Sequence, residues 1–299
     1  MKIVNIIGGL GNQMFQYAFA LRLKDNYKDE KVYIDTSHFN YLFFKKIGTA
    51  NLHNGYEVED VFPNASLPHA KPWQLMKVSW YIPNFWVSRA ARRFLPKRSS
   101  EYIQKRLNAF AYTPDVLHHN KDMYYEGIWE YIQYLNPVRA EIQHVFSHPE
   151  PNEKNRFYIE QMKKENSVGI HVRRGDYLLH PDFSNICDLE YYTKAIQEIL
   201  SDNESHTIYV FSNDMKWCKE NLSPLAKGHN IIYVTDNTGK DSCWDMFLMS
   251  HCKDLIIANS SFSWWGAFLN DKGGRVIAPK KWTNREAEYD IWLDEWIKI

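Results

Sequence analysis

Residues 168–177 read VGIHVRRGDY, an apolar run that turns polar at its carboxyl end. The run 168–172 is short and rich in β-branched residues, which is typical of a buried strand in a parallel sheet. Further strands are expected at 207–211, 231–234, 254–258 and 275–277, and helices at 189–200, 214–221, 241–250 and 261–269. Strands that alternate with helices in this way predict a mostly parallel, doubly wound α/β sheet.

The first residues predict another α/β unit. A strand at 2–7, a glycine-rich turn, a helix at 12–27 and a strand at 32–35 would form one βαβ unit. Between 39 and 120 the periodicity is poor and prolines interrupt it.

The tract 147–155 contains Pro149 and Pro151 and is the best candidate linker. We therefore expect two Rossmann-like domains facing a cleft, with bounds 1–150 and 151–299. Asn136 and Pro137 are expected to cap and begin a helix at 138–146.

Composition limits the class of protein. The chain has 299 residues, of which 44% are hydrophobic and 24% are charged, as in a globular protein. Thirty-six basic residues balance 36 acidic ones, so no nucleic-acid partner is expected. We expect no transmembrane helix and no signal peptide. The four cysteines form no CxxC pair, which favours reduced thiols and a cytoplasmic location.

The segment 171–177 carries the densest chemistry. Arg173 and Arg174 follow the carboxyl end of a strand, where ligands bind in parallel sheets. Each guanidinium presents a planar fork of donors that suits phosphate oxygens, so we expect an anion site. The alternative is a structural ion pair with Asp176.

Other polar residues are expected at the same sheet edge. Serines at the start of a helix, together with its free backbone N–H groups, could bind a phosphate, although serine is also an ordinary N-cap. Carboxylate and amide groups could accept hydrogen bonds from a purine, although capping explains them almost as well. The candidates are Ser261, Phe262 and Ser263 for the phosphate, and Asn213, Asp214 and Asp245 for the purine.

The turn 8–13 reads GGLGNQ and matches neither a P-loop nor a dinucleotide fingerprint. Gly9 and Gly11 would let the backbone approach a ligand, and Asn12 and Gln13 could donate hydrogen bonds across the cleft. The alternative is a tight turn with Asn12 as the helix N-cap. No residues have the spacing of a metal site, so no divalent metal is expected.

Residues 61–100 contain seven Lys or Arg, seven aromatic residues and no Asp or Glu. Such a basic aromatic segment could bind a carbohydrate, an anionic carrier or an anionic membrane surface. The alternative is a solvated basic helix with an aromatic core face.

Three segments resemble motifs of the α-1,2-fucosyltransferases of glycosyltransferase family 11, particularly the bacterial members. The similar segments are 8–17, GGLGNQMFQY; 171–177, HVRRGDY; and 245–266, which begins DMFLMS and ends NSSFSWWG. The resemblance covers nearly the whole chain, and the region 61–120 matches no motif of the family.

The resemblance implies a GT-B type fold in which the N-terminal domain faces the acceptor and the C-terminal domain binds GDP-β-L-fucose. Fucose would pass with inversion to O2 of a terminal β-galactoside in glycan or O-antigen synthesis, without a cofactor or divalent metal. The acceptor could be lipid-linked, which would place the enzyme peripherally at the inner face of the membrane.

The resemblance also implies roles for single residues. Arg173 would grip the diphosphate with Arg174 beside it, His171 and Asp245 would face the guanosine, and 261–263 would hold a phosphate. Asp176 is the nearest motif carboxylate for a catalytic base, or it orients the arginines. A different linkage or acceptor, and a carbohydrate-binding protein without catalysis, are the alternatives.

Overall fold

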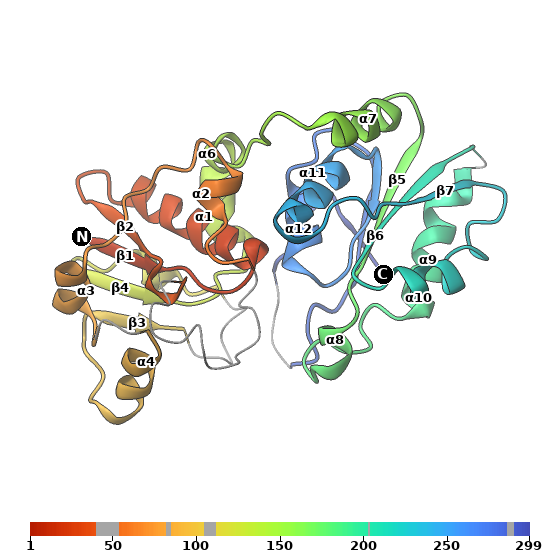
Figure 1. Cartoon of the computed structure of the whole chain (residues 1–299). Helices are drawn as coiled ribbons and strands as arrows, with labels where there is room; N and C mark the ends of the chain where they lie inside the picture. Colours follow the sequence, from red (N-terminus) through yellow and green to blue (C-terminus); the bar gives the residue numbers. More distant parts are fainter. Residues whose placement is uncertain (40–53, 82–84, 105–111, 203, 286–289) are drawn as a thin grey trace. The chain divides into compact units, whose positions relative to one another are not determined.

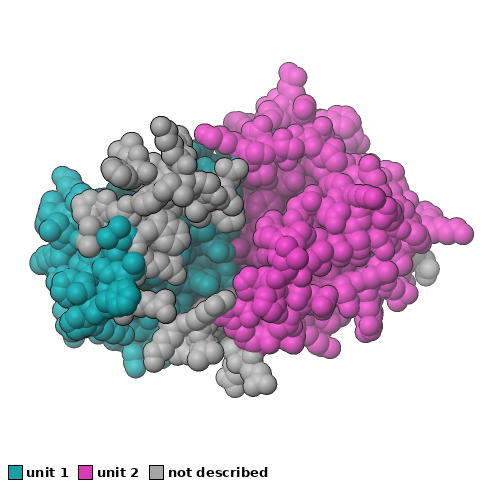
Figure 2. Space-filling model, turned by 60° about the horizontal axis from the view of Figure 1, so that its bottom comes forward, with its two compact units in different colours: residues 1–149, 287–291 teal, residues 150–286, 292–299 magenta. Residues whose placement is uncertain are grey.

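The computed structural model describes residues 1–39, 54–81, 85–104, 112–202, 204–285 and 290–299, and these residues form two parallel sheets. Figure 2 colours the two compact units, Met1–Pro149 with Ala287–Ile291, and Glu150–Glu286 with Trp292–Ile299. The short segment 287–291 was expected in the second domain. It belongs to the first unit, where the Ile132 N–H donates to the Asp290 carbonyl oxygen at 2.8 Å.

Unit 1 contains a four-stranded sheet in the order β2-β1-β4-β3. Its strands are β1 (Lys2–Asn5), β2 (Val32–Asp35), β3 (Glu101–Ile103) and β4 (Met123–Glu126), all in parallel pairs. The helices and 3-10 turns are α1 (Leu10–Asn26), η1 (Ser37–Phe39), α2 (Val58–Val61), α3 (Pro72–Val78), α4 (Phe85–Phe94), η3 (Pro114–Leu117), α5 (Ile132–Leu135), η4 (Asn136–Val138) and α6 (Arg139–Val145).

Successive residues of β4 serve the two faces of this sheet. Tyr124 packs with Ile3 and α3 on one face. Tyr125 meets Phe19 of α1 edge to face on the other, and Phe19 also stacks on Trp129 with ring centroids 3.9 Å apart. Because side chains alternate along a strand, two adjacent tyrosines anchor both layers.

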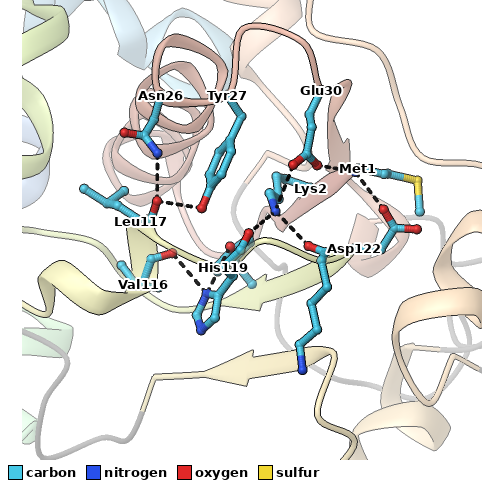
Figure 3. A network of polar contacts seen from close by, with 11 residues as sticks. Met1, Lys2, Asn26, Tyr27, Glu30, Val116, Leu117, His119 and Asp122 are labelled. Carbon is cyan, nitrogen blue, oxygen red and sulfur yellow. Dashed lines mark hydrogen bonds and ion pairs between the residues drawn. The ribbon is translucent and has the colours of Figure 1, made fainter.

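A polar network ties together the amino ends of β1 and β4 (Figure 3). The ammonium of fully buried Lys2 donates to the carbonyl oxygens of His119 and Lys121, and lies 4.1 Å from the centroid of the Tyr27 ring. Glu30 pairs with Lys2 and with the amino group of Met1. Burial lowers the pKa of Lys2 despite these partners. The network lies at the amino ends of the strands, opposite the carboxyl ends, where parallel sheets generally bind ligands.

Unit 2 contains a six-stranded sheet in the order β10-β9-β8-β5-β6-β7. Its strands are β5 (Ser167–Val172), β6 (Thr207–Ser212), β7 (Asn230–Tyr233), β8 (Asp254–Ile256), β9 (Val276–Ala278) and β10 (Ile297–Lys298). The helices and 3-10 turns are α7 (Glu153–Met162), α8 (Asp176–Leu179), α9 (Leu189–Ile199), η5 (Leu200–Asp202), α10 (Met215–Asn221), η6 (Gly239–Ser242), α11 (Cys243–His251) and α12 (Ser261–Phe268).

Helices cover both faces of this sheet, with α9 and α10 on one side and α11 and α12 on the other (Figure 1). All six residues of β5 are buried, as expected for a central parallel strand. The α/β class with mostly parallel sheets is therefore confirmed in both units.

One expectation and one alternative about helix starts were wrong. Asn136 has helical dihedral angles and continues directly from α5, where it is the C-cap, into a 3-10 turn, so it is not an N-cap and α6 begins at Arg139. Asn12 is also not an N-cap, because α1 begins at Leu10 and Gly9 occupies the cap position. In both places helical structure begins before the polar residue that was expected to start it.

Candidate functional site

The paired arginines lie at the carboxyl ends of two neighbouring strands. Val172 of β5 pairs with Ser212 of β6, and the chain leaves both strands immediately afterwards, toward α8 and α10 (Figure 1). Arg173 and Arg174 follow β5, and Asn213 and Asp214 follow β6. Four polar side chains therefore meet at the edge where parallel sheets bind ligands.

Arg174 is fixed within the protein. Its N–H donates to Asn213 Oδ1 at 2.9 Å, and its Nε donates to Asp214 Oδ2 at 3.2 Å. The guanidinium carbon lies 4.3 Å from the centroid of the Trp217 ring. Asp214 also caps α10, because its Oδ1 accepts from the Trp217 N–H at 3.1 Å. Arg174 therefore links the ends of β5 and β6, and Asp214 and Trp217 hold its guanidinium in place.

Arg173 is held more loosely. One terminal nitrogen donates to Asp176 Oδ2 at 2.9 Å, and the guanidinium carbon lies 5.3 Å from the Tyr177 ring centroid. Its Nε is buried without a hydrogen-bond partner. Since a buried donor without an acceptor is costly, this N–H points to an anion as its partner.

Gly175 allows the chain to turn between these residues. Its φ of 60° lies in the left-handed region, and a Cβ there would come within 3.0 Å of Asn213 Nδ2. A side chain at this position would crowd the Asn213 amide, whose oxygen accepts the hydrogen bond from the Arg174 N–H.

His171 lies just below this edge, at the end of β5. It is buried, and burial with the nearby Arg173 charge lowers its pKa to about 3, so the ring is neutral at physiological pH. Nδ1 is buried without a hydrogen-bond partner. The ring lies 5.9 Å, centroid to centroid, from Phe262 at the start of α12. The structure thus brings together His171, Arg173 and the first turn of α12.

The start of α12 agrees only in part with the expectation. Ser261 and Phe262 are partly exposed, in the first turn of a helix whose N–H groups can bind an anion. The Ser263 side chain is fully buried, and its hydroxyl hydrogen-bonds to the carbonyl oxygens of Ala258 and Ser260. Ser263 could therefore contact a phosphate through its backbone N–H but not through its hydroxyl.

Asp245 lies in the first turn of α11, in a chain of amide groups. Asn237 donates to Asp245 Oδ1 at 2.9 Å. The Asn237 and Asn155 side-chain amides donate to each other, and Asn155, on α7, also donates to Asn152, the N-cap residue of that helix. Burial raises the pKa of Asp245 to about 7; the Asn237 hydrogen bond opposes this rise, and the nearby charge of Asp236 adds to it. The carboxyl group is therefore oriented and close to its titration point at neutral pH.

The turn 8–13 lies in unit 1, where Gln13 requires a correction. Its side chain is fully buried, with Nε2 donating to the carbonyl oxygens of Gly8 and Gly55, and Oε1 accepting from the Glu57 N–H. Gln13 fixes the turn and has no group left for a ligand. Gly9 caps α1, and Gly11 is buried in its first turn, so Asn12 is the partly exposed polar side chain of this segment.

Sequence reasoning missed two kinds of site residue. Trp217 lies three residues after Asp214, so the helix period could have placed it beside the cap and the arginine. Asn155 and Asn237 are 82 positions apart, and no sequence pattern joins them. Their role depends on how α7 packs against α11.

The described residues include neither a metal-ligand cluster nor a membrane-spanning helix. They contain no group of three or more His, Cys, Asp or Glu side chains placed to hold a metal ion. No helix among them is long and apolar enough to span a bilayer. The four cysteines are free thiols.

The chain is similar to known glycosyltransferases over its whole length. The model of glycosyl transferase family 11 matches residues 1–299. An α-1,2-colitosyltransferase of Escherichia coli is 30% identical over 99% of this chain and 98% of its own. The O-antigen biosynthesis glycosyltransferase WbnK of E. coli is 29% identical over 98% of each chain. The galactoside α-(1,2)-fucosyltransferase 2 of Sus scrofa is 24% identical over all of this chain and 80% of its own.

The structure is also similar in fold to a solved structure of low sequence identity. The fucosyltransferase NodZ from Bradyrhizobium superposes with a TM-score of 0.51 at 14% identity, over 90% of this chain and 92% of its own. This agrees with the expected GT-B type architecture.

Proposed function

Because the chain belongs to glycosyl transferase family 11, we propose that it transfers L-fucose from GDP-β-L-fucose to O2 of a terminal β-galactoside, with inversion. The observation that carries this proposal is the pair of arginines at the end of β5, one fixed by Asp214 and one with a buried free Nε. Such a pair suits a diphosphate that leaves with increasing negative charge.

In the proposed reaction, Arg173 and the start of α12 would each stabilise the departing GDP. When the bond between fucose and the β-phosphate breaks, positive charge develops on the sugar and negative charge on GDP. Arg173 would donate to the β-phosphate, and the first-turn N–H groups of α12 would donate to another phosphate oxygen. Interactions that strengthen as charge develops lower the barrier more than they stabilise the bound substrate.

Asp176 fits an orienting role better than that of a base. It is largely exposed and already accepts a hydrogen bond from Arg173. The acceptor hydroxyl would then lose its proton to water or to the leaving phosphate, and Asp176 would aim the guanidinium.

The relatives' names support two donors. Colitose lacks the 3-hydroxyl of fucose, and the similar E. coli protein is named a colitosyltransferase. A site that hydrogen-bonds the 3-hydroxyl would select fucose strongly, whereas an apolar site would discriminate weakly. GDP-colitose is therefore the second candidate donor. The name of WbnK supports an O-antigen acceptor, which would be lipid-linked at the inner face of the membrane.

The test is GDP release from purified protein with lactose and either GDP-fucose or GDP-colitose, with and without EDTA, followed by linkage analysis. Fucosylated lactose linked at galactose O2 and unaffected by EDTA is the expected product. Faster transfer from GDP-colitose would replace the donor. GDP-fucose binding without transfer would move the search to other acceptors, and thermal stabilisation by galactosides but not by GDP would favour a carbohydrate-binding protein.

A further inference from the structure

Large apolar side chains are exposed on α3 and at the end of α4 in unit 1. Phe94 is 84% exposed, Trp73 is 63% and Met76 is 58%, and Leu95 is also exposed. Trp73 and Met76 lie one turn apart on α3, and Phe94 ends α4. We call these four residues with Lys71 and Lys97 the α3–α4 face. Several large apolar side chains exposed to water on neighbouring elements are typical of an interaction site.

Arg98 and Trp80 join the two helices into one surface. The Arg98 guanidinium donates to the carbonyl oxygens of Met76, Lys77 and Ser79 at the end of α3, at 2.8 to 3.0 Å. Trp80 donates from its indole to the Pro96 carbonyl oxygen at 2.9 Å and lies under Arg98. The segment after α4 is thus tied to the end of α3, beside the edge strand β3 (Figure 1).

α4 presents a second apolar row. Val87, Ala90 and Phe94 are exposed at positions i, i+3 and i+7, which lie on one side of a helix, whereas Ser88 is buried. Arg89, Arg92 and Arg93 belong to the same helix, and their side chains, like that of Trp86, lie outside the described residues. A helix with this sequence is apolar and cationic at once.

The charge of this region is one-sided. No Asp or Glu occurs between residues 61 and 100, and Lys71 and Lys97 are exposed. The acidic residues described near this segment have partners: Glu101 is buried and accepts from the Trp80 N–H, Asp122 pairs with Lys77 and the Met1 amino group, and Glu59 lies 2.9 Å from His69 Nε2. Among the described residues, the α3–α4 face therefore carries an excess of positive charge around its apolar groups.

We propose that the α3–α4 face docks on an anionic lipid bilayer, with Trp73 and Phe94 inserted at the headgroup level and Lys71 and Lys97 on the lipid phosphates. Aromatic groups surrounded by cations are what an anionic membrane surface attracts. A protein partner would need no excess of cations, and a nucleic acid would need no exposed Met76 or Leu95. The docking deepens the proposed function, because a lipid-linked acceptor would lie at that surface, but the contact itself depends on no donor.

The experiment is sedimentation of the full chain with vesicles of phosphatidylcholine alone or with phosphatidylglycerol added, without substrates. Binding is expected to the anionic vesicles at low salt and to fall at high salt. Trp73→Ser and Phe94→Ser should each weaken it about tenfold, since each removes a large apolar side chain from the interface. Lys71→Gln with Lys97→Gln should weaken it by about fivefold per charge.

Matched controls come from unit 2. Phe157 on α7 is 60% exposed, so Phe157→Ser removes a similar aromatic group elsewhere, and Lys163→Gln with Lys227→Gln removes two exposed charges. These controls should bind vesicles as the unchanged chain does. All variants should transfer sugar to soluble lactose at the unchanged rate, which separates this proposal from the proposed function.

Three results would overturn the proposal. The first is no binding to anionic vesicles at low salt, and the second is equal weakening by Phe157→Ser. The third is a change of oligomeric state on Trp73→Ser or Phe94→Ser in ultracentrifugation without vesicles, which would assign the face to a second copy of the chain.

Discussion

Arg173 and Arg174 are adjacent in sequence but differ in how the protein holds them. The guanidinium and the backbone N–H of Arg174 both donate to residues after β6, whereas Arg173 keeps a buried Nε without an acceptor. Sequence placed both at the ligand edge. It could not assign their separate tasks, because the difference arises from Asp214 and Trp217, which are reached only when β6 pairs with β5.

Replacing Arg173 should therefore affect the chemical step. Arg173→Ala is expected to lower kcat/KM by about 100- to 1,000-fold, the usual cost of removing a donor aimed at developing charge. Arg173→Lys should restore part of this, because the charge returns without the fork of donors. Steady-state GDP release with lactose measures both, and full activity of Arg173→Ala would assign the leaving-group role elsewhere.

Asp176→Asn separates orientation from base catalysis. An orienting carboxylate should leave the acidic limb of the pH–rate profile in place, and its loss should raise the KM for the donor several-fold, since the guanidinium is no longer aimed. Loss of the acidic limb together with a large fall in kcat would instead identify Asp176 as the base. The pH–rate profile of kcat/KM in both proteins decides between the two.

Asp245 predicts a pH dependence of donor binding. Its pKa of about 7 lies above the ordinary 3.8, so the folded protein holds a proton between these values that the unfolded chain has released. The free energy of unfolding should therefore fall as the pH rises from about 4 to about 7, by up to a few kcal/mol. A guanine that donates N–H groups needs the ionised carboxylate, so donor affinity should rise with pH up to about 7 and then level off.

Calorimetric titration of GDP-fucose between pH 5 and 8 measures this effect, because the sugar diphosphate keeps its charge over that range. His171, with its pKa near 3, stays neutral throughout. Asp245→Asn should bind more weakly and without the pH dependence. Asn237→Ala should shift the midpoint upward, since the Asn237 amide stabilises the ionised form. A slope that persists in Asp245→Asn would point to another titrating group.

At the scale of elements, burial decides what sequence could predict. β5 and β6 were expected within one residue at each end, because central parallel strands are continuous apolar runs bounded by polar residues. β3 spans only Glu101–Ile103, and β10 only Ile297–Lys298, and both are edge strands. Their identity depends on pairing with β4 and β9, which no local pattern shows.

The contact between α11 and α12 offers a test of element packing. A Cβ on Gly266 would lie 3.1 Å from Met249 Cβ and 3.2 Å from the Met246 carbonyl oxygen, so the two helices meet at this glycine. Gly266→Val should destabilise the fold by about 1 to 3 kcal/mol, the usual cost of overpacking. It should also raise the KM for the donor, because α12 carries Ser261 and α11 carries Asp245.

Thermal unfolding and donor titration measure the two effects of Gly266→Val. A matched control is Gly228→Ala, because a Cβ on Gly228 meets no atom within 4 Å although its φ is positive, so that variant strains only the local backbone. If both variants change donor binding equally, the contact between α11 and α12 does not position the donor-binding residues.

At the scale of the whole molecule, the residues proposed to bind the donor come from several parts of unit 2. Residues 171–177, 211–217 and 259–263 follow the neighbouring strands β5, β6 and β8, and residues 237–245 follow β7 at the edge of the sheet. The sequence showed that each segment ends a strand or begins a helix, and that sufficed to place most of them at one edge. Gln13 in unit 1 was misjudged because its hydrogen-bond partners, Gly55 and Glu57, lie more than 40 residues away.

Hydrogen exchange can show which segments respond to the donor. With GDP-fucose at about 100 times its dissociation constant, binding stabilises the folded state by about 2.7 kcal/mol, so amides that exchange through opening of the site should slow by about 100-fold. We expect this in peptides covering 171–177, 211–217 and 259–265. Peptides around Lys2 and Asp122, at the opposite end of the unit 1 sheet, should not change. Equal slowing around Lys2 and Asp122 would instead indicate a general stabilisation of the fold and would contradict donor binding at these three segments.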